Sequence, residues 1–157
     1  MTSKRNALPE PALTRGEFDE VLFQALRGIY IFEREKVDRF KLSYQEIFLL
    51  QYLRRHSPAS MTSISLEMRL PLSTCSRLVG RLEKMRLLSR KKADRDRRII
   101  LVSLNKKGEK AVTDVERHSF ETILANLSGY GPEQIDSFIA TARELGTLLR
   151  PRDARES

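Results

Sequence analysis

The sequence predicts a mostly α-helical fold that carries one β-hairpin, an α+β class. Apolar residues recur every three or four positions over most of the chain, which is the period of an amphipathic helix. The pattern changes to that of paired strands around residues 87–104. Capping signals and breaks at proline or glycine divide the helical pattern into separate helices.

Two helices are expected in the N-terminal third. Residues 14–17, Thr-Arg-Gly-Glu, have the spacing of a capping box and open a long helix over about 15–39. Its apolar stripe is wide for one small neighbour, so it can serve a subunit interface as well as the core. Residues 43–46, Ser-Tyr-Gln-Glu, form a second capping box that opens a helix to about Arg55.

A short helix and a longer one follow. Thr62 can cap the short helix, expected over residues 63–69, and Pro71 forces it to stop because proline disfavours helix at the residue before it. Ser73 is the expected N-cap of the longer helix, since its hydroxyl can accept a hydrogen bond from an amide of the first turn. The apolar stripe of this helix consists of Cys75, Leu78, Val79, Leu82 and Met85.

A two-stranded hairpin is expected after the longer helix. Residues 87–90 lead into one strand, residues 99–104 read as its partner, and the tip between them, KKADRDRR, is too charged to be buried. A short helix, a turn, an amphipathic helix and a basic hairpin in this order are typical of a winged helix-turn-helix.

The C-terminal third predicts two more helices. Asn105 can cap a long helix, residues 129–132, Gly-Tyr-Gly-Pro, break it, and a last helix runs over about 133–149. The first and last helices carry more apolar residues than one small core can hold, so we expect them to form a homodimer interface. The residues expected there are Phe18, Leu22, Ile135, Phe138, Leu145 and Leu149.

The elements suggest a simple organisation of the chain. A winged helix-turn-helix domain over residues 43–104 is expected between dimerisation helices over 14–42 and 105–149, with flexible tails at 1–13 and 150–157.

Positive charge is concentrated in one part of the chain. The net charge is +8, and residues 54–98 hold 13 Lys and Arg against 4 Asp and Glu. A solvated surface would spread this excess, whereas a concentrated basic patch on a helix and a hairpin indicates a surface that binds phosphate. An acidic membrane surface fits less well, because no lipid-facing apolar helix face accompanies the patch.

The polar face of the longer helix supplies the first candidate contacts with DNA. Arg77 and Arg81 are four residues apart, so they are neighbours on that face. Arginine can donate two parallel hydrogen bonds to O6 and N7 of guanine; contact with phosphate alone is the alternative. The other candidates on this helix are Ser73, Thr74, Ser76 and Lys84. The serines and threonine would position the helix on phosphate, or only cap it.

The hairpin tip supplies the second set. Arg98, with Arg95 or Arg97, is expected in the minor groove, where a narrow groove and its negative potential favour arginine. The alternative is a charged loop that becomes ordered only on DNA. Asp96 would orient one of these arginines through a charge-assisted hydrogen bond.

The order of elements and three stretches of sequence resemble the MarR family of bacterial transcriptional regulators. The stretches are residues 42–50, 61–90 and 96–112, the last with an Asp-x-Arg tip at residues 96–98. The resemblance implies an obligate homodimer whose first and last helices interlock, with the two winged domains on successive major grooves. It further implies a repressor of transcription that is released by a small, often aromatic, ligand.

Two positions depart from the family pattern. Arg86 stands where members commonly have a glycine with positive φ, which costs about 1 kcal/mol unless the turn is built differently. Pro71 stands in the helix-turn-helix turn, where glycine is common.

A ligand pocket is expected where the first, second and fifth helices meet above the winged domain. Tyr30, Tyr44 and Phe48 are placed to line it. The alternative for each is an ordinary contact in the core or in the dimer.

Other classes of function find little support. Cys75, the single cysteine, excludes an internal disulfide and lies on the buried stripe, so we expect an inert structural thiol. His56 and His118 stand apart without zinc spacing, and no nucleophile beside a base or glycine-rich phosphate loop is visible. We expect neither metal, cofactor nor catalytic residues, and neither a membrane span nor a signal peptide, which suits the cytoplasm.

Two functions remain from these residues. The first is a dimeric regulator that binds double-stranded DNA at a near-palindromic operator. The second is a winged-helix interaction module whose basic face binds an acidic protein.

Overall fold

The computed structural model describes residues 13–150. They fall into two compact units, which divide between Val115 and Glu116. The predicted tails, 1–13 and 150–157, lie outside the described residues apart from one residue at each. Among the described residues, none of the helices combines the length and the apolar character needed to cross a membrane.

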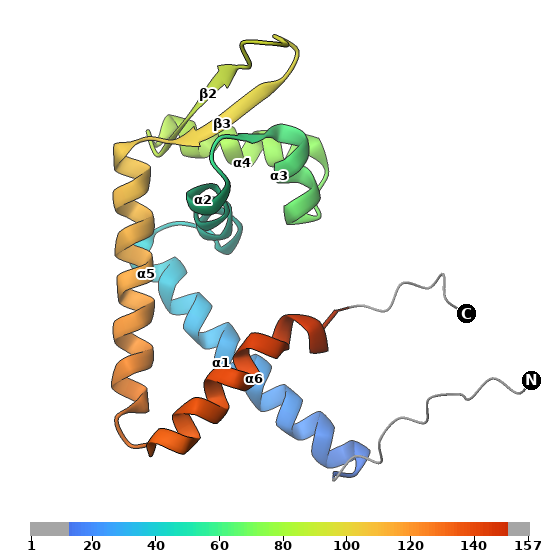
Figure 1. The fold of residues 1–157 in the computed structure, drawn as a ribbon, viewed down its shortest axis with the longest axis vertical. Helices are drawn as coiled ribbons and strands as arrows, with labels where there is room; N and C mark the ends of the chain where they lie inside the picture. The colour runs from blue at the N-terminus through green and yellow to red at the C-terminus, as the bar shows by residue number, and fades with distance from the viewer. Residues whose placement is uncertain (1–12, 151–157) are drawn as a thin grey trace, which may run out of the picture. The chain divides into compact units, whose positions relative to one another are not determined.

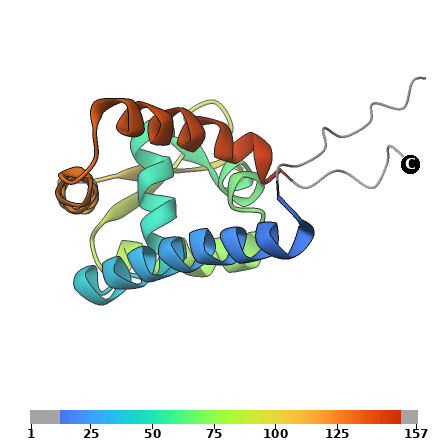
Figure 2. The ribbon, with the colours of Figure 1, turned by 90° about the horizontal axis from the view of Figure 1, so that it is seen from below.

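Both predicted capping boxes are present. In α1, Arg15–Phe40, the side chain of Thr14 accepts from the backbone of Glu17 at 3.3 Å, and Figure 2 shows this helix, blue to cyan, without interruption. In α2, Tyr44–His56, the backbone N–H of Ser43 donates to Glu46 Oε2 at 2.7 Å. The helices therefore begin where the sequence indicated.

The next two helices begin earlier than predicted. The N-cap of α3, Met61–Met68, is Ser60 and not Thr62, because the extended backbone of Ser60 lets its hydroxyl accept from the amide of Ser63 at 3.0 Å. The prediction that Ser73 caps α4, Leu72–Lys84, is also wrong. Pro71 holds that position without a side-chain hydrogen bond, and Ser73 falls inside the first turn.

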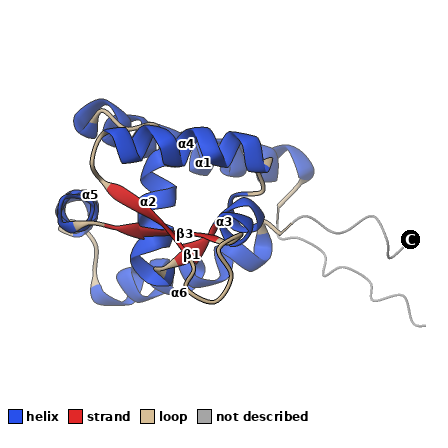
Figure 3. Cartoon of the chain, turned by 90° about the horizontal axis from the view of Figure 1, so that it is seen from above, coloured by secondary structure: helices blue, strands red, loops and turns tan. Residues whose placement is uncertain are grey.

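Three antiparallel strands form a small sheet. β2, Leu88–Lys92, and β3, Ile100–Leu104, make the predicted hairpin, with Leu88 opposite Leu104. β1, Ala59–Ser60, pairs with the other edge of β3 and was not predicted. Figure 1 shows the hairpin extending past α3 and α4, and Figure 3 shows all three strands in red.

The core of the first unit lies between α2, α3, α4 and the sheet. Of the predicted stripe on α4, three residues are fully buried, and Leu78 and Met85 are partly buried against them. The buried hydrophobic residues are Leu42, Ile47, Leu49, Leu50, Leu53, Ala59, Ile64, Cys75, Val79, Leu82, Leu87, Leu88, Val102, Val112 and Val115. This packing leaves the polar face of α4 outward.

Two side-chain hydrogen bonds from the start of α5, Lys106–Leu127, hold the turn between α4 and β2. Arg86 takes the left-handed conformation, φ 59°, which glycine adopts most readily. Its carbonyl accepts the side-chain amide of Asn105 at 2.8 Å, and the carbonyl of Met85 accepts Lys107 Nζ at 3.0 Å. Asn105 also accepts from Gly108 N at 3.0 Å, as expected of the cap of α5.

The second unit contains the end of α5 and all of α6, Pro132–Leu148. Gln134 accepts from the backbone of Gly131 at 3.1 Å, which confirms the predicted break and restart of the helix. Tyr130 and Phe138 pack edge to face, with ring centroids 5.2 Å apart. Much of the apolar surface of this unit stays exposed in the single chain, at Phe120, Ile123, Leu124, Phe138, Ile139, Leu148 and Leu149.

Candidate nucleic-acid interface

The outer face of α4, which we define as Ser73, Thr74, Ser76, Arg77, Arg81 and Lys84, is available to a partner. All of these residues are exposed except Thr74, which is partly buried. Arg77 Nη2 donates to Thr74 Oγ1 at a long 3.4 Å, so its side chain is only lightly held. The helical period alone produces this face, because the opposite stripe packs into the core.

Arg81 has a partner that the sequence pattern did not indicate. Its Nε lies 3.0 Å from Oε1 of Glu46, the residue that caps α2. The Glu46 side chain is fully buried, whereas that of Arg81 is 62% exposed. Only the packing of α2 against α4 brings these residues together, so no local signal could have revealed the pair.

Arg90 of β2 joins the hairpin to α4, and it was also missed. Its Nη2 donates to the carbonyl of Ser76 at 2.9 Å, and its Nε lies 3.4 Å from Glu83 Oε2. A Cβ at Gly80 would meet Arg90 Nη2 at 3.3 Å, so the guanidinium lies close along the helix. The alternation of a strand could have indicated this residue, since Arg90 shares a face with the buried Leu88.

The tip of the hairpin is short and internally bonded. Asp96 Oδ1 accepts the backbone N–H of Arg98 at 2.9 Å, and its carbonyl accepts that of Ile99 at 3.0 Å. The carboxylate therefore shapes the backbone on which Arg98 stands, whereas a bond to an arginine side chain was predicted. Arg95, Arg97 and Arg98 are all exposed.

A groove of about 570 Å³ joins the two predicted contact regions. Arg98 from the tip lies along it together with Ser73 and Ser76 from α4. The remaining lining residues are Ser60, Met61, Thr62, Leu72, Arg90, Ile99 and Ile100. Arg97 lies elsewhere, beside a depression formed by the hairpin itself. The groove therefore brings the hydroxyl-bearing residues Ser73 and Ser76 together with the cation of Arg98, a combination that suits a phosphate.

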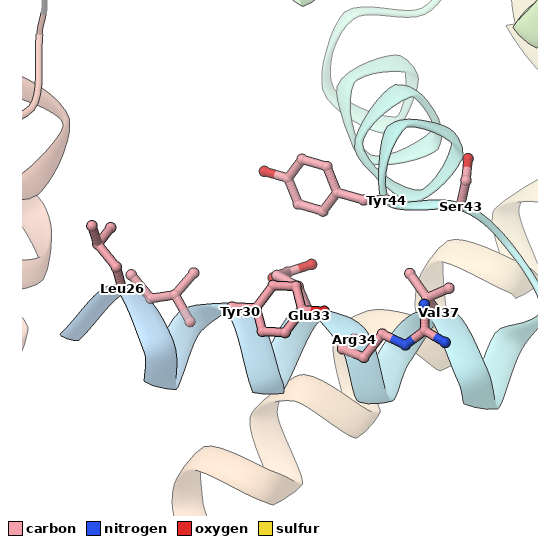
Figure 4. Close-up of a pocket in the computed structure, with 8 residues that line it drawn as sticks. Leu26, Tyr30, Glu33, Arg34, Val37, Ser43 and Tyr44 are labelled. Carbon is pink, nitrogen blue, oxygen red and sulfur yellow. The ribbon is translucent and has the colours of Figure 1, made fainter. Parts of the chain in front are cut away.

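A second cavity lies between α1 and the start of α2 (Figure 4). Its volume is about 520 Å³, and it is lined by Tyr30 and Tyr44, two of the three residues expected at a ligand pocket. Its lining comes from α1 and the start of α2, whereas a pocket that also includes the fifth helix was expected. The wall is mostly apolar but includes Glu33, whose carboxylate lies 2.6 Å from Nζ of the buried Lys36. Phe48 does not line this cavity. It lines two smaller ones, a cavity of about 290 Å³ with Tyr52 and His56 and a cavity of about 280 Å³ with Tyr44.

The residues predicted for the dimer interface differ in exposure. Phe18, on α1, is 53% exposed, and Leu22 is partly buried. In the second unit Phe138 and Leu149 are 47% and 49% exposed, and Ile135 and Leu145 are partly buried.

The thiol of Cys75 is buried, as expected, and its Sγ lies 3.8 Å from the carbonyl oxygen of Leu70. Burial raises the pKa of the Cys75 thiol, which opposes formation of the reactive thiolate. Within residues 13–150 there is no group of three or more His, Cys, Asp or Glu residues that could hold a metal ion.

Comparison with solved structures identifies the fold. A MarR family protein from Bacillus stearothermophilus superposes with a TM-score of 0.76 at 21% identity, over 88% of this chain and 99% of that one. Streptococcus pneumoniae FabT in complex with DNA gives 0.73 at 20%, over 87% and 97%. Bordetella bronchiseptica BpsR, whose DNA binding is regulated by 6-hydroxynicotinic acid, gives 0.63 at 18%, over 83% and 98%.

The sequence comparison identifies the family. No curated protein sequence matches the chain. Residues 32–115, more than half of the 157 residues, match the family described as transcriptional regulator SarA/Rot. The chain therefore belongs to the SarA/Rot family of transcriptional regulators, and its winged-helix fold is of the MarR type.

Proposed function

We propose that this chain is a homodimeric repressor that binds a near-palindromic operator and is released by a small ligand. The observation that carries the proposal is the groove in which Arg98 of the hairpin and Ser73 and Ser76 of α4 lie together. A strand of DNA backbone seated there would place the outer face of α4 in the major groove and the tip in the minor groove.

The charges of this region support DNA as the partner. The winged helix-turn-helix, residues 43–104, carries the basic excess, and Arg77 and Arg81 stand one turn apart on the exposed face. Both arginines would donate to guanine edges. Lys84 and the hydroxyls of Ser73, Thr74 and Ser76 would bind phosphate, and Arg95, Arg97 and Arg98 would follow the minor groove with Asp96 shaping the tip.

Two identical winged domains would explain a near-palindromic site. Large exposed apolar residues on α1 and α6 support a homodimer, because monomeric proteins rarely expose extensive apolar patches. We assign dimerisation to residues 14–42 and 105–149. A two-fold dimer presents two copies of α4, so the half-sites should lie roughly 10 bp apart, one turn of DNA.

The cavity between α1 and α2 supports regulation by a ligand. About 520 Å³ is room for a small organic molecule. Tyr30 and Tyr44 line it, which suits a planar ring. The reported regulation of BpsR by 6-hydroxynicotinic acid is a precedent for such a molecule on this fold.

Selection from random double-stranded DNA tests the proposal, with wild type, Arg77→Ala and Arg98→Ala compared. The wild type should enrich a near-palindrome. Arg77→Ala should cost about 1–3 kcal/mol and relax the preference at one base pair per half-site. Arg98→Ala should weaken binding to all sequences more evenly and flatten the salt dependence.

Two results would contradict the proposal. The first is that the wild type enriches no palindrome and binds DNA no more tightly than an acidic polypeptide such as poly-glutamate. A winged-helix module that binds an acidic protein would then be the better explanation. If Arg77→Ala and Arg98→Ala change binding identically, α4 only grips phosphate and direct base readout is wrong.

A further inference from the structure

Glu46 is a buried carboxylate with two unlike tasks. Its Oε2 accepts the backbone N–H of Ser43 at 2.7 Å, which completes the cap of α2. Its Oε1 is buried, has no hydrogen bond within the described residues, and lies 3.0 Å from Nε of Arg81. The side chain of Glu46 has no exposed surface, so the charge of Arg81 is its compensation.

Capping alone does not require this carboxylate. Gln can replace Glu in a capping box because only one accepting oxygen is used. Glu17 shows the simpler case: its carboxylate caps α1 through Thr14 at an exposed position. At position 46 a negative charge is buried at considerable cost, and its second oxygen faces an arginine of the DNA-facing helix.

We infer that Glu46 is a positioning residue that holds Arg81 in the orientation in which it reads a base, an inference that rests on the proposed function. A guanidinium carries five N–H donors, and the ion pair with Glu46 lies at its Nε atom. The Arg81 side chain remains 62% exposed, so its Nη groups can donate hydrogen bonds to DNA. An arginine already fixed by its neighbour loses less conformational freedom when it binds.

Arg77 provides an internal contrast on the same face. Its contact is the 3.4 Å hydrogen bond to Thr74 within its own helix, and no buried carboxylate fixes it among the described residues. Arg81 should therefore discriminate one base pair sharply, whereas Arg77 should tolerate more substitutions at the base pair it meets.

The experiment measures affinity for the site that wild type selects and for single-base variants of it. The proteins are wild type, Glu46→Gln, Arg81→Ala and the double variant. Glu46→Gln keeps the capping oxygen and removes the charge. Glu17→Gln is the matched control, since it makes the same change in a capping box whose partner is Thr14.

Arg81→Ala should weaken binding to the selected site by roughly 5- to 150-fold, the range for a lost bidentate base contact. Glu46→Gln should weaken it by about three- to tenfold through lost preorganisation. It should relax the preference at the same base pair, with affinity for unrelated duplexes unchanged. In the Arg81→Ala background, Glu46→Gln should have no further effect on DNA binding. Glu17→Gln should have no effect on DNA binding in either the wild-type or the Arg81→Ala background.

The double variant also guards against misfolding. Arg81→Ala leaves the Glu46 charge buried without its partner and can unfold the protein, but Glu46→Gln/Arg81→Ala removes both charges and can be compared with Glu46→Gln alone. The inference is overturned if Glu46→Gln binds the selected site as tightly as wild type does. It is also overturned if the double variant loses as much affinity as the two single variants together. If wild type selects no site, the proposed function fails, and this inference with it.

Discussion

Gly108 lies directly against the backbone of Leu87: a Cβ atom added to Gly108 would stand 1.8 Å from the Leu87 carbonyl oxygen. The same oxygen accepts the backbone N–H of Asn105 at 3.2 Å. The start of α5 therefore closes on the chain just after α4 with no space for a side chain. This contact makes glycine a requirement of packing at position 108, where the backbone has no positive φ.

We predict that Gly108→Ala destabilises the protein by about 3 kcal/mol or more, because a rigid backbone carbonyl must move to admit the methyl group. Gly16→Ala is the control, since a Cβ there meets nothing within 4 Å. Urea denaturation at one fixed protein concentration measures both. Equal midpoints for the two variants would show that the Leu87–Gly108 contact can open without cost.

The left-handed turn at Arg86 leads to a prediction of the opposite sign. Arg86→Gly should stabilise the fold by about 0.5–1 kcal/mol, because glycine adopts positive φ without the strain that a Cβ causes. Arg86→Ala removes the same long side chain but keeps the Cβ, so it should bring no gain. A higher urea midpoint for alanine than for glycine would mean that the side chain, and not the backbone, carries the strain.

The proposed dimer can be tested at Phe18, which is 53% exposed in the single chain. Sedimentation equilibrium at micromolar concentration should give wild type twice the 18.2 kDa mass of one chain. Phe18→Glu should shift the protein toward monomer, because the interface would bury an unpaired charge. Leu66→Glu, at a residue 74% exposed on α3, should remain dimeric. A monomeric wild type would contradict the dimer and the palindromic operator together.

Cys75 should be chemically quiet in the folded protein. Burial raises the pKa of its thiol above the ordinary value of 9.0, so the folded state favours the protonated form. The resulting stability is present below pH 9 and is lost as the pH rises through the raised pKa. Alkylation by iodoacetamide at pH 8 should be about tenfold or more slower than in the urea-unfolded chain.

The same burial excludes Cys75 as an oxidant sensor in our interpretation. Cys75→Ala should leave the effect of peroxide on DNA binding unchanged, as followed by fluorescence anisotropy of a labelled operator. A release by peroxide that occurs in wild type and disappears in this variant, with DNA affinity intact, would show that the thiol is reached by oxidant after all.

The features that depend on near neighbours in the chain could be predicted from the sequence. Capping boxes at residues 14–17 and 43–46, the stripe through Cys75 and Val79, and the cap at Asn105 all act within one or two turns, and the structure has them. The hairpin and its charged tip were also predicted, because alternation and charge are local properties. The outer face of α4 followed from the same helical period.

Tertiary structure alone decided the contacts between distant segments. The two-residue strand β1 exists because β3 offers it an edge, and Ser60, at its end, then begins α3 in place of Thr62. The pairing of Arg81 with Glu46 joins residues far apart in the chain, as does the contact of Arg90 with α4. Such partners are set by how helices and strands pack, and no local pattern in the sequence encodes which side chains the packing will bring within a few ångströms.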